Sequence, residues 1–371
     1  MTEIGLIGLP NVGKSTVFSL LTEISVPIEK FPFTTIEPNV GIVEVPDEKL
    51  DFIANALPNE KKTYATIKFV DIAGLIKDAS KGEGLGNKFL ANIREVDGVV
   101  HVLRFFNDNS VPSSVGKIDP IEEIDIINTE LLLADIEVLE NYCSKLEPKA
   151  KSGDKISIER LNLAKRLIEF FNTTSKISDI KTFMINNILN KDKEIDSLVR
   201  NLLMPKSRVF LLNYDESVDK DDLQRKILEV ENYTGCKTLS LCAKFELSLF
   251  EFPENEREQI RKEYGIPDKE LKEFIKQSVK SLNLITFYTI VGKEFRAWLI
   301  KKGANILDAA EKIHSDMKEG FINAEVCKFE KFKETPDIRL LSQQGNIKIV
   351  GKDYIVEEGD IIKINFHKKF S

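Results

Sequence analysis

A glycine-rich segment near the N-terminus, Gly8-Leu-Pro-Asn-Val-Gly13-Lys14-Ser15, decides which kind of fold this chain can adopt. It matches the pattern G-x-x-x-x-G-K-[ST], with a strand-like run, Ile4–Leu9, before it and a helical run, Val17–Leu21, after it. In this order the glycines let backbone amides turn toward a phosphate at the N-terminus of the helix. Lys14 then reaches the β- and γ-phosphates of a nucleotide, and the Ser15 hydroxyl binds Mg²⁺. The sequence therefore predicts a phosphate-binding loop in an α/β domain.

The composition is typical of a globular protein with two or three domains, since the chain has 371 residues, of which 42% are hydrophobic and 30% charged. The formal net charge of −7 argues against a general polyanion binder, and we expect no sequence-specific DNA partner. No apolar run approaches the ~18 residues of a membrane span, and the chain begins with a strand rather than a basic leader. We therefore expect a soluble protein that is not secreted and has no membrane partner. Four scattered cysteines are expected to be reduced thiols.

Residues 1–128 alternate strand-like runs with helical patterns, as in the parallel sheet of a doubly wound α/β domain. The predicted strands are Ile4–Leu9, Gly41–Val45, Ala65–Asp71 and Gly98–Arg104. Two further buried runs, Arg208–Asn213 and Lys237–Cys242, indicate that the sheet resumes later in the chain. We therefore predict a nucleotide-binding domain made of residues 1–128 and 203–281.

Residues 129–202 have the three- and four-residue apolar spacing of long helices. The segment Pro148–Asp154 is expected to break the first helix, and the pattern restarts over Leu161–Phe171. This indicates an αα-hairpin or short coiled coil inserted into the first domain. Such a hairpin is either a set of packed helices or an arm for a partner, and the pattern does not separate the two.

Residues 282–368 have a third kind of pattern, several short strands with one helix, which predicts a small β-grasp domain. The expected elements are strands Thr286–Val291, Phe295–Ile300, Asp353–Val356 and Ile361–Phe366, with a helix over Ile306–Met317.

A second element for Mg²⁺ and the γ-phosphate follows the third predicted strand, where Asp71-Ile-Ala-Gly74 has the form D-x-x-G. The Asp71 carboxylate can hold Mg²⁺, often through water, and the Gly74 amide can reach the γ-phosphate. A third element is the loop Phe33–Ile36, in which Thr35, favoured over Thr34, can give its hydroxyl to Mg²⁺. Both threonines can equally be ordinary loop residues.

The residues that would read the base depart from the guanine-specific pattern N-K-x-D. Asn213 is present, but Tyr214 replaces the Lys and Glu216 replaces the Asp that accepts hydrogen bonds from guanine. Glu is one methylene longer and cannot hold the same bidentate geometry, so most of the preference for guanine is lost. The Ala243 amide in Cys242–Lys244 can donate to guanine O6 or to adenine N1. These residues favour ATP over GTP; the alternative is that residues 213–216 are only a strand-to-loop turn.

Two further positions concern hydrolysis. Leu75 follows Gly74, where many GTPases carry a Gln that orients the attacking water, so we expect slow intrinsic turnover. Asn11 in the phosphate loop can help to bind a monovalent cation, which makes K⁺ a candidate second cofactor, or it can simply be a loop former. The glycine-rich segment Lys81–Asn87 suits a loop that changes conformation with the nucleotide.

The sequence resembles the Obg-like ATPases of the YchF type over essentially the whole chain. The segments that carry the resemblance are GLPNVGKST at 8–16, FPFTTIEPNVGIVEVPD at 31–47, DIAGLIKDASKGEGLGNKFLANIREVD at 71–97, NxxE at 213–216, RAWLIKKG at 296–303, AAEKIHSDMKEGFINAEV at 309–326 and GKDYIVEEGDIIKINF at 351–366. The resemblance implies an OBG-type G domain interrupted by a coiled coil and followed by a TGS (β-grasp) domain. It also implies a cytoplasmic, Mg²⁺-dependent hydrolase that prefers ATP and associates with the ribosome, through the large subunit, in translation or stress responses.

The resemblance also assigns residues. It assigns Asn11–Thr16 to the nucleotide loop, Ser15 and Thr35 to Mg²⁺ and Asn213 to the base. Together with the residues argued above, the predicted nucleotide-binding set is Asn11, Val12, Gly13, Lys14, Ser15, Thr16, Asn213, Glu216 and Ala243; the catalytic set is Lys14, Asp71 and Gly74; the metal set is Ser15, Thr35 and Asp71. Two departures stand out: no histidine follows Asn107–Asn109, where some members carry one, and Tyr214 is bulkier than expected and can stack on the base. A GTP-specific switch and a binding module with little hydrolysis remain the alternatives.

Overall fold

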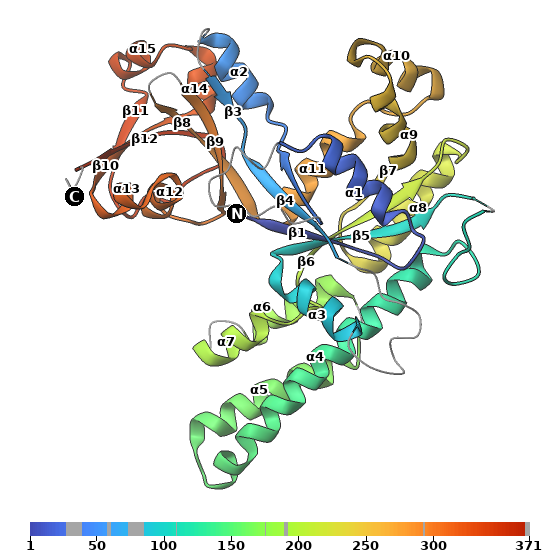
Figure 1. Cartoon of the computed structure of the whole chain (residues 1–371). Coiled ribbons are helices and arrows are strands. Elements are labelled where there is room, and N and C mark those ends of the chain that lie inside the picture. Colours follow the sequence, from blue (N-terminus) through green and yellow to red (C-terminus); the bar gives the residue numbers. More distant parts are fainter. Residues whose placement is uncertain are drawn as a thin grey trace. The chain divides into compact units, whose positions relative to one another are not determined.

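The computed structural model describes residues 1–26, 39–57, 61–72, 85–108, 110–174, 176–188, 192–291 and 294–367 (Figure 1). The chain forms two compact units, residues 1–43 with 68–278 and residues 44–67 with 279–371. No helix within the described ranges has the length and apolar character needed to cross a membrane.

The first unit is built on a six-stranded sheet with strand order β2-β4-β1-β5-β6-β7. The strands are β1 (Glu3–Ile7), β2 (Val40–Glu44), β4 (Thr66–Asp71), β5 (Gly98–Phe105), β6 (Ser207–Tyr214) and β7 (Thr238–Leu241). Strand β1 pairs in parallel with β4 and β5, and β6 pairs in parallel with β5 and β7. Seven of the eight residues of β5 are buried, as expected for a strand covered by helices on both faces. This is the P-loop GTPase fold, and the predicted doubly wound sheet is confirmed.

Helices lie on both faces of this sheet, with α1 on one face and α3 and α4 on the other (Figure 1). The helices of the unit, apart from the insertion, are α1 (Lys14–Glu23), α3 (Leu85–Glu95), α8 (Lys220–Thr234), α9 (Ala243–Ser248), α10 (Glu254–Tyr264) and α11 (Glu270–Ser281), with a 3-10 turn at Leu249–Glu251.

The predicted helical insertion is present, but its first helix is longer than its pattern indicated. The helices are α4 (Pro120–Lys151), α5 (Lys155–Phe171), α6 (Ile177–Asn187) and α7 (Lys193–Arg200). Helix α4 begins at Pro120 because the Asp119 side chain caps it, accepting from the amides of Ile121 and Glu122. The helix breaks within the predicted segment Pro148–Asp154, although α4 continues past Pro148 to Lys151. The turn comes at Gly153, whose φ of +88° reverses the chain before α5.

The second unit contains a mixed six-stranded sheet, with order β11-β10-β12-β8-β9-β3. Its elements are α2 (Glu48–Ala56), β3 (Lys61–Thr63), β8 (Leu284–Val291), β9 (Glu294–Lys301), α12 (Ile306–Ile313), α13 (Ser315–Glu319), β10 (Phe321–Lys328), α14 (Phe329–Glu334), α15 (Ile338–Gln343), β11 (Ile347–Val350) and β12 (Asp360–Phe366). The hairpin β8–β9, the helix α12 packed on the sheet and the parallel pair β8–β12 form a β-grasp arrangement.

Three predictions for the second unit were wrong in detail. Asp353–Val356 is not a strand, because only Ile355 forms an isolated bridge, with Asn305. Strands β10 and β11 were not predicted, and the expected helix Ile306–Met317 is divided at His314, whose φ of −164° is extended. Buried and exposed residues do not alternate along β11, so its sequence does not indicate a strand clearly.

Residues 44–67 were assigned to the nucleotide-binding domain, and the structure corrects this. Strand β3 pairs in parallel with β9 and so extends the second sheet. The ring of Phe52 packs edge-on against Phe329 at 5.8 Å, and the Tyr288 hydroxyl donates to Asp47. Pairing and packing between distant segments thus draw this segment into the second unit. The remaining domain boundaries are still a proposal.

Candidate functional site

The phosphate-binding loop connects β1 to α1, and its shape depends on two left-handed residues. Gly13 has φ +85°, and a Cβ atom there would lie 2.1 Å from Nδ2 of Asn213, so only glycine fits. Asn11 has φ +66°, a conformation that Asn tolerates better than most residues. Its Nδ2 donates to the carbonyl oxygen of Pro112 at 3.2 Å, and Ser114 Oγ donates to that of Pro10 at 2.6 Å. The loop is therefore held in place from the segment that follows β5.

Lys14, the first residue of α1, forms an ion pair with Asp71, which ends β4 beside Leu6 of β1. Their side chains are only 11% and 19% exposed. The Lys14 ammonium is therefore partly desolvated and directed at a carboxylate, which a nucleotide phosphate can replace as its partner. This places two predicted site residues together.

The donors around Lys14 fit Mg²⁺ held jointly with a nucleotide. Ser15 is exposed at the first turn of α1, and Asp71 ends the neighbouring strand β4. In the part of the chain that the structure describes, no group of three or more His, Cys, Asp or Glu side chains could hold a metal alone. Mg²⁺ commonly takes one or two protein ligands and completes its shell with phosphate oxygens and water. Ser15 and Asp71 are suited to that mode of binding.

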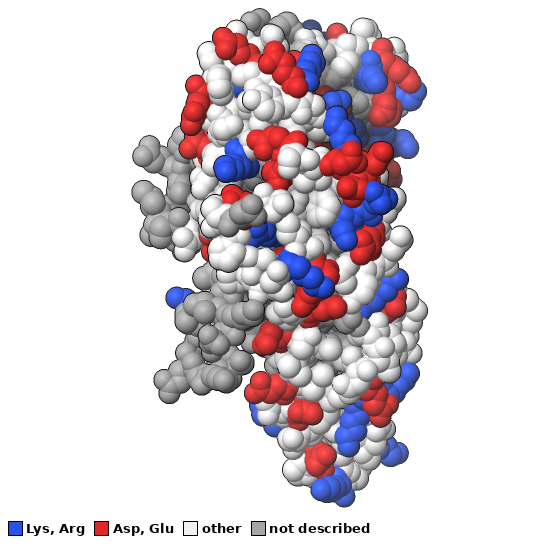
Figure 2. All heavy atoms as spheres, turned by 90° about the vertical axis from the view of Figure 1, so that its right-hand side faces the viewer, with Lys and Arg blue, Asp and Glu red and all other residues white. Residues whose placement is uncertain are grey.

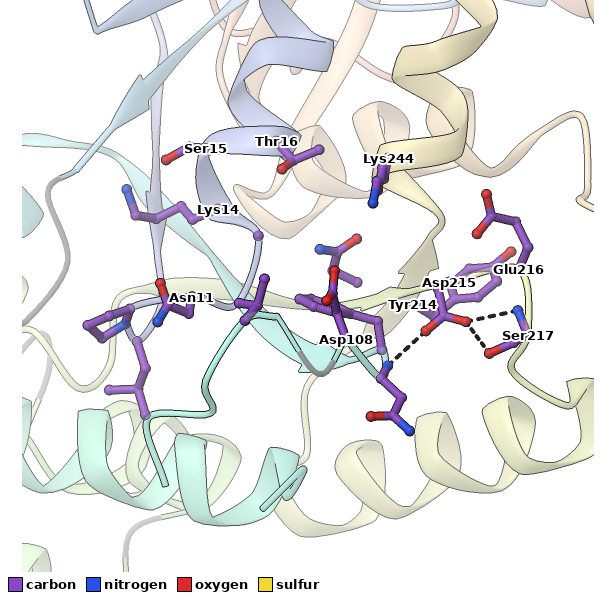
Figure 3. Close-up of a pocket in the computed structure, with 17 residues that line it drawn as sticks. Asn11, Lys14, Ser15, Thr16, Asp108, Tyr214, Asp215, Glu216, Ser217 and Lys244 are labelled. Carbon is purple, nitrogen blue, oxygen red and sulfur yellow. Dashed lines mark hydrogen bonds between the residues drawn. The ribbon is translucent and has the colours of Figure 1, made fainter. Parts of the chain in front are cut away.

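A cavity of about 1030 Å³ extends from the phosphate loop to the end of β6 (Figure 3). Its walls come from the loop residues Asn11 and Gly13–Thr16, the segment after β5, the residues 213–217 and Lys244. Figure 3 shows Lys14 and Ser15 at one side of this space and Glu216 and Lys244 at the other. A cavity of this size is large enough for a nucleoside triphosphate, with phosphates at the loop and the base beside residues 213–217.

Asn213, the predicted base-reading residue, joins three parts of the site. Its Nδ2 donates to the carbonyl oxygen of Val12 at 3.0 Å, and its Oδ1 accepts from the amide of Ala243 at 3.4 Å. Val12 and Ala243 were predicted to bind nucleotide, but neither side chain is part of the cavity wall. Their backbone groups instead contact Asn213, which connects the phosphate loop to the β7–α9 junction.

Tyr214, which could stack on the base, lines the cavity, but its side chain is only 6% exposed. Its hydroxyl donates to both carboxylate oxygens of Glu270, each at 3.0 Å. Burial raises the pKa of Tyr214, and the nearby Glu270 charge raises it further. Burial also raises the pKa of Glu270 to about 7, although hydrogen bonds from Tyr214 and Ser240 oppose this. Glu216, in contrast, is exposed in the cavity wall.

The segment after β5 also lines the cavity, and we did not predict it as part of the site. Phe106, Asn107 and Asp108 belong to the wall, and the Asn107 amide donates to Asp215 Oδ2 at 2.8 Å. The Arg104 guanidinium lies over the Phe106 ring, 4.5 Å from its centre. One signal could have found this segment: β5 is the central neighbour of β1, and ligands bind at the carboxyl ends of parallel strands.

Several predicted residues lie outside the described ranges. These are Thr34, Thr35, Gly74, Leu75, Asn109 and residues 81–84 of the glycine-rich segment. Their roles in binding Mg²⁺, in sensing the γ-phosphate and in turnover stay predictions.

Comparison with known proteins places the chain among relatives of the same length. A family model described as "50S ribosome-binding GTPase" matches residues 3–142, and the model YchF-GTPase_C, described as a protein of unknown function, matches residues 284–367. The chain is similar to the Ribosome-binding ATPase YchF of Haemophilus ducreyi, with 37% identity over 98% of both chains. The protein of that name from Mycoplasma genitalium is 38% identical over 99% of this chain and all of its own.

A solved structure agrees with these sequence matches. The structure of the Schizosaccharomyces pombe YchF GTPase superposes with a TM-score of 0.81 and 28% identity, over 98% of this chain and 97% of the other. The likeness thus includes the helical insertion and the C-terminal unit as well as the P-loop domain. With near-complete coverage and identity well above 30% to several relatives, the chain belongs to the YchF family.

Proposed function

We propose that this protein is a Mg²⁺-dependent ATPase of the Obg-like branch, with slow intrinsic turnover, that acts as a cytoplasmic nucleotide switch on the ribosome. The observation that carries the proposal is the cavity between the phosphate loop and residues 213–217. The relatives named above as ribosome-binding ATPases support the reaction and the partner. The description "50S ribosome-binding GTPase" favours the large subunit.

The base end of the cavity supports ATP over GTP. Guanine-specific sites read the N1–H and 2-amino group with an Asp, and this chain has the longer Glu216 in that place. Because adenine has no donors on that edge, it loses nothing when the Asp is absent. The side-chain amide of Asn213 is already hydrogen-bonded to Val12 and Ala243, so Asn213 shapes the wall that faces the base.

The roles of the residues around the phosphates follow from their positions. Lys14 exchanges Asp71 for the β- and γ-phosphates, and the amides of the phosphate loop surround them. When bound, Mg²⁺ would neutralise charge on the phosphates, with Ser15 and Thr35 as its protein ligands and Asp71 beside them. Gly74 would contact the γ-phosphate through its amide. Slow turnover is proposed because Leu75 cannot orient a water molecule.

The surface supports ribosome binding through particular contacts rather than through a general positive field. On the face shown in Figure 2, acidic and basic side chains are interspersed among neutral ones. The net charge of −7 agrees with this mixed surface. A protein of this charge gains little from long-range attraction to RNA, so we expect its ribosome binding to depend on specific contacts.

The experiment that tests base selectivity is calorimetric titration of nucleotide-free protein with ATP and with GTP, in Mg²⁺ and K⁺. We expect ATP to bind more tightly by about tenfold, or ~1.4 kcal/mol. Tighter binding of GTP would assign a GTPase switch instead. Repeating the titration with Na⁺ in place of K⁺ tests the proposed role of Asn11 in binding a monovalent cation.

A second experiment tests the switch. ATP turnover is measured with and without ribosomes, and cosedimentation with separated subunits is compared in ADP and in a non-hydrolysable ATP analogue. We expect slow turnover alone, and binding to the large subunit that differs between the two nucleotides. Tight ATP binding with no turnover in either condition would make the protein a nucleotide-stabilised binding module.

A further inference from the structure

The carboxylate of Glu270 collects hydrogen bonds from three places around the base end of the cavity. Tyr214 Oη, at the end of β6, donates to both of its oxygens at 3.0 Å. Ser240 Oγ, in β7, donates to Oε1 at 3.0 Å, and the backbone amide of Cys242 donates to the same carboxylate. One side chain at the start of α11 therefore ties together the carboxyl ends of two adjacent strands.

These hydrogen bonds to Glu270 lie next to residues 213–217, which would face the base. Asn213 and Tyr214 both line the cavity, next to Asp215–Ser217, and adjacent side chains of a strand point to opposite faces. Asn213 thus faces the phosphate loop while Tyr214 faces Glu270. Cys242 immediately precedes Ala243, whose amide donates to Asn213. Movement of Glu270 would therefore shift the backbone on both sides of Asn213.

A second contact fixes α9 relative to the start of α11. Glu246, buried in the first turn of α9, accepts from Nε and Nη2 of Arg261 in α10 at 2.8 and 2.9 Å. Nη1 of Arg261 donates to Asp268, in the connection that leads to α11, at 3.0 Å. Arg261 thus links α9 to the connection before α11. Because this connection is fixed by Arg261, the first residue of α11, Glu270, is held in place against β6 and β7.

We propose that Glu270 is a positioning residue for base selectivity, acting through Tyr214 and the Cys242–Ala243 peptide without touching the nucleotide. The inference rests on the proposed function, because it assumes that residues 213–217 face the base. It predicts that loss of the tie affects recognition of the base and leaves recognition of the phosphates intact. The phosphate loop has its own anchors, since Asn11 and Pro10 are bonded to the segment after β5.

The test measures the affinities of the full-length protein for ATP, GTP and inorganic tripolyphosphate, all with Mg²⁺. The variants are Glu270→Ala, Tyr214→Phe and the control Glu273→Gln, which removes an exposed carboxylate from the same helix. We expect the first two to bring the ratio of ATP to GTP affinity closer to one by about fivefold, the equivalent of one hydrogen bond. Tripolyphosphate affinity should not change, and Glu273→Gln should behave as wild type.

Two results would overturn the inference. One is an unchanged affinity ratio in the folded variants; the other is an equal loss for tripolyphosphate and ATP, which would mean a merely structural role. Tyr214→Phe removes a single oxygen atom, so it decides the question if Glu270→Ala does not fold. If wild-type protein binds neither nucleotide, the proposed function itself fails. If it binds ATP and only the ratio stays constant in the variants, the inference alone fails.

Discussion

Nδ2 of Asn213 lies 3.0 Å from the carbonyl oxygen of Val12, so the end of β6 holds the phosphate-binding loop directly. The two residues are 201 positions apart in the chain, and the whole helical insertion lies between them. The loop that meets the phosphates and the strand that ends beside the base are therefore one structural assembly. Loss of the Asn213 amide itself is therefore expected to affect both ends of the site.

Replacing Gly13 with Ala should abolish ATP binding while the protein remains folded. The new Cβ would lie 2.1 Å from Asn213 Nδ2, in a backbone conformation with φ +85°, so the loop must move. Gly153→Ala is a matched control, because Gly153 has φ +88° but nothing within 4 Å of the added atom. The control should cost about 1 kcal/mol of stability and bind ATP normally. Titration calorimetry and urea denaturation of both variants check this. Normal ATP binding by Gly13→Ala would contradict it.

Replacing Lys14 with Ala should eliminate nucleotide binding and turnover, because the β- and γ-phosphates lose their only charged partner in the loop. The substitution also leaves the Asp71 carboxylate without its ion pair. Lys68→Ala is a suitable control, since Lys68 lies in β4, the strand that ends at Asp71, and its ion pair with Glu3 at 3.1 Å is away from the cavity. Phosphate release assays and ATP titration should separate the two variants. Retention of both activities by Lys14→Ala would remove the loop from the mechanism.

Replacing Glu216 with Asp should raise GTP affinity relative to ATP, because the shorter side chain restores the geometry that accepts both guanine donors. We expect a change of about tenfold in the affinity ratio, in line with one charged hydrogen-bond contact. Glu216→Gln controls for charge at nearly constant length and should not favour GTP. Competition binding with both nucleotides measures the ratio. If Glu216→Asp leaves it unchanged, the backbone reads the base and this side chain does not.

The stability of the protein should fall as pH rises from about 5 to above 7, in part because of Glu123. This residue of α4 is 1% exposed and accepts from the Arg104 amide at 3.0 Å. Burial raises the pKa of Glu123 to about 7 from its ordinary value of 4.5. The folded state therefore holds the proton more tightly than the unfolded chain in this interval, and deprotonation at higher pH favours unfolding. Asp135 and Glu270, whose pKa values are raised to about 6 and 7, act in the same direction.

Glu123→Gln isolates that contribution. The slope of unfolding free energy against pH should become less negative by up to about 1.4 kcal/mol per pH unit near pH 6, the value for one proton. Urea denaturation at pH 5.5, 6.5 and 7.5 gives the slope for both proteins. Equal slopes in the two proteins would show that this carboxyl does not titrate with a raised pKa.

Local patterns were enough to predict much of the site. The spacing of Gly8, Gly13, Lys14 and Ser15 between a strand and a helix specified the phosphate loop, and the run ending at Asn213 specified β6. Both depend only on neighbouring residues, such as the need for left-handed backbone at Gly13. The same kind of pattern found the helical insertion, because apolar spacing repeats along a helix regardless of its surroundings.

Local patterns failed where a residue's role depends on a distant partner. The hydrogen bond from the Tyr214 hydroxyl to Glu270, 56 residues later, could not be predicted from the residues around Tyr214. Phe106 was not predicted to line the cavity, since its position there follows from the adjacency of β5 and β1. Residues 44–67 were placed in the wrong unit because β3 has only three residues, and so short a sequence does not indicate that it pairs with β9.

The sequence by itself thus determined the phosphate-binding loop, the α/β class and the family, because these follow from short-range backbone geometry and residue order. Only the tertiary structure decided which side chains surround the base, which carboxylates are buried with raised pKa values, and where the second unit acquires its extra strand. Those features arise from packing between segments far apart in the chain, where burial and hydrogen-bond partners are set by neighbours in space rather than by neighbours in sequence.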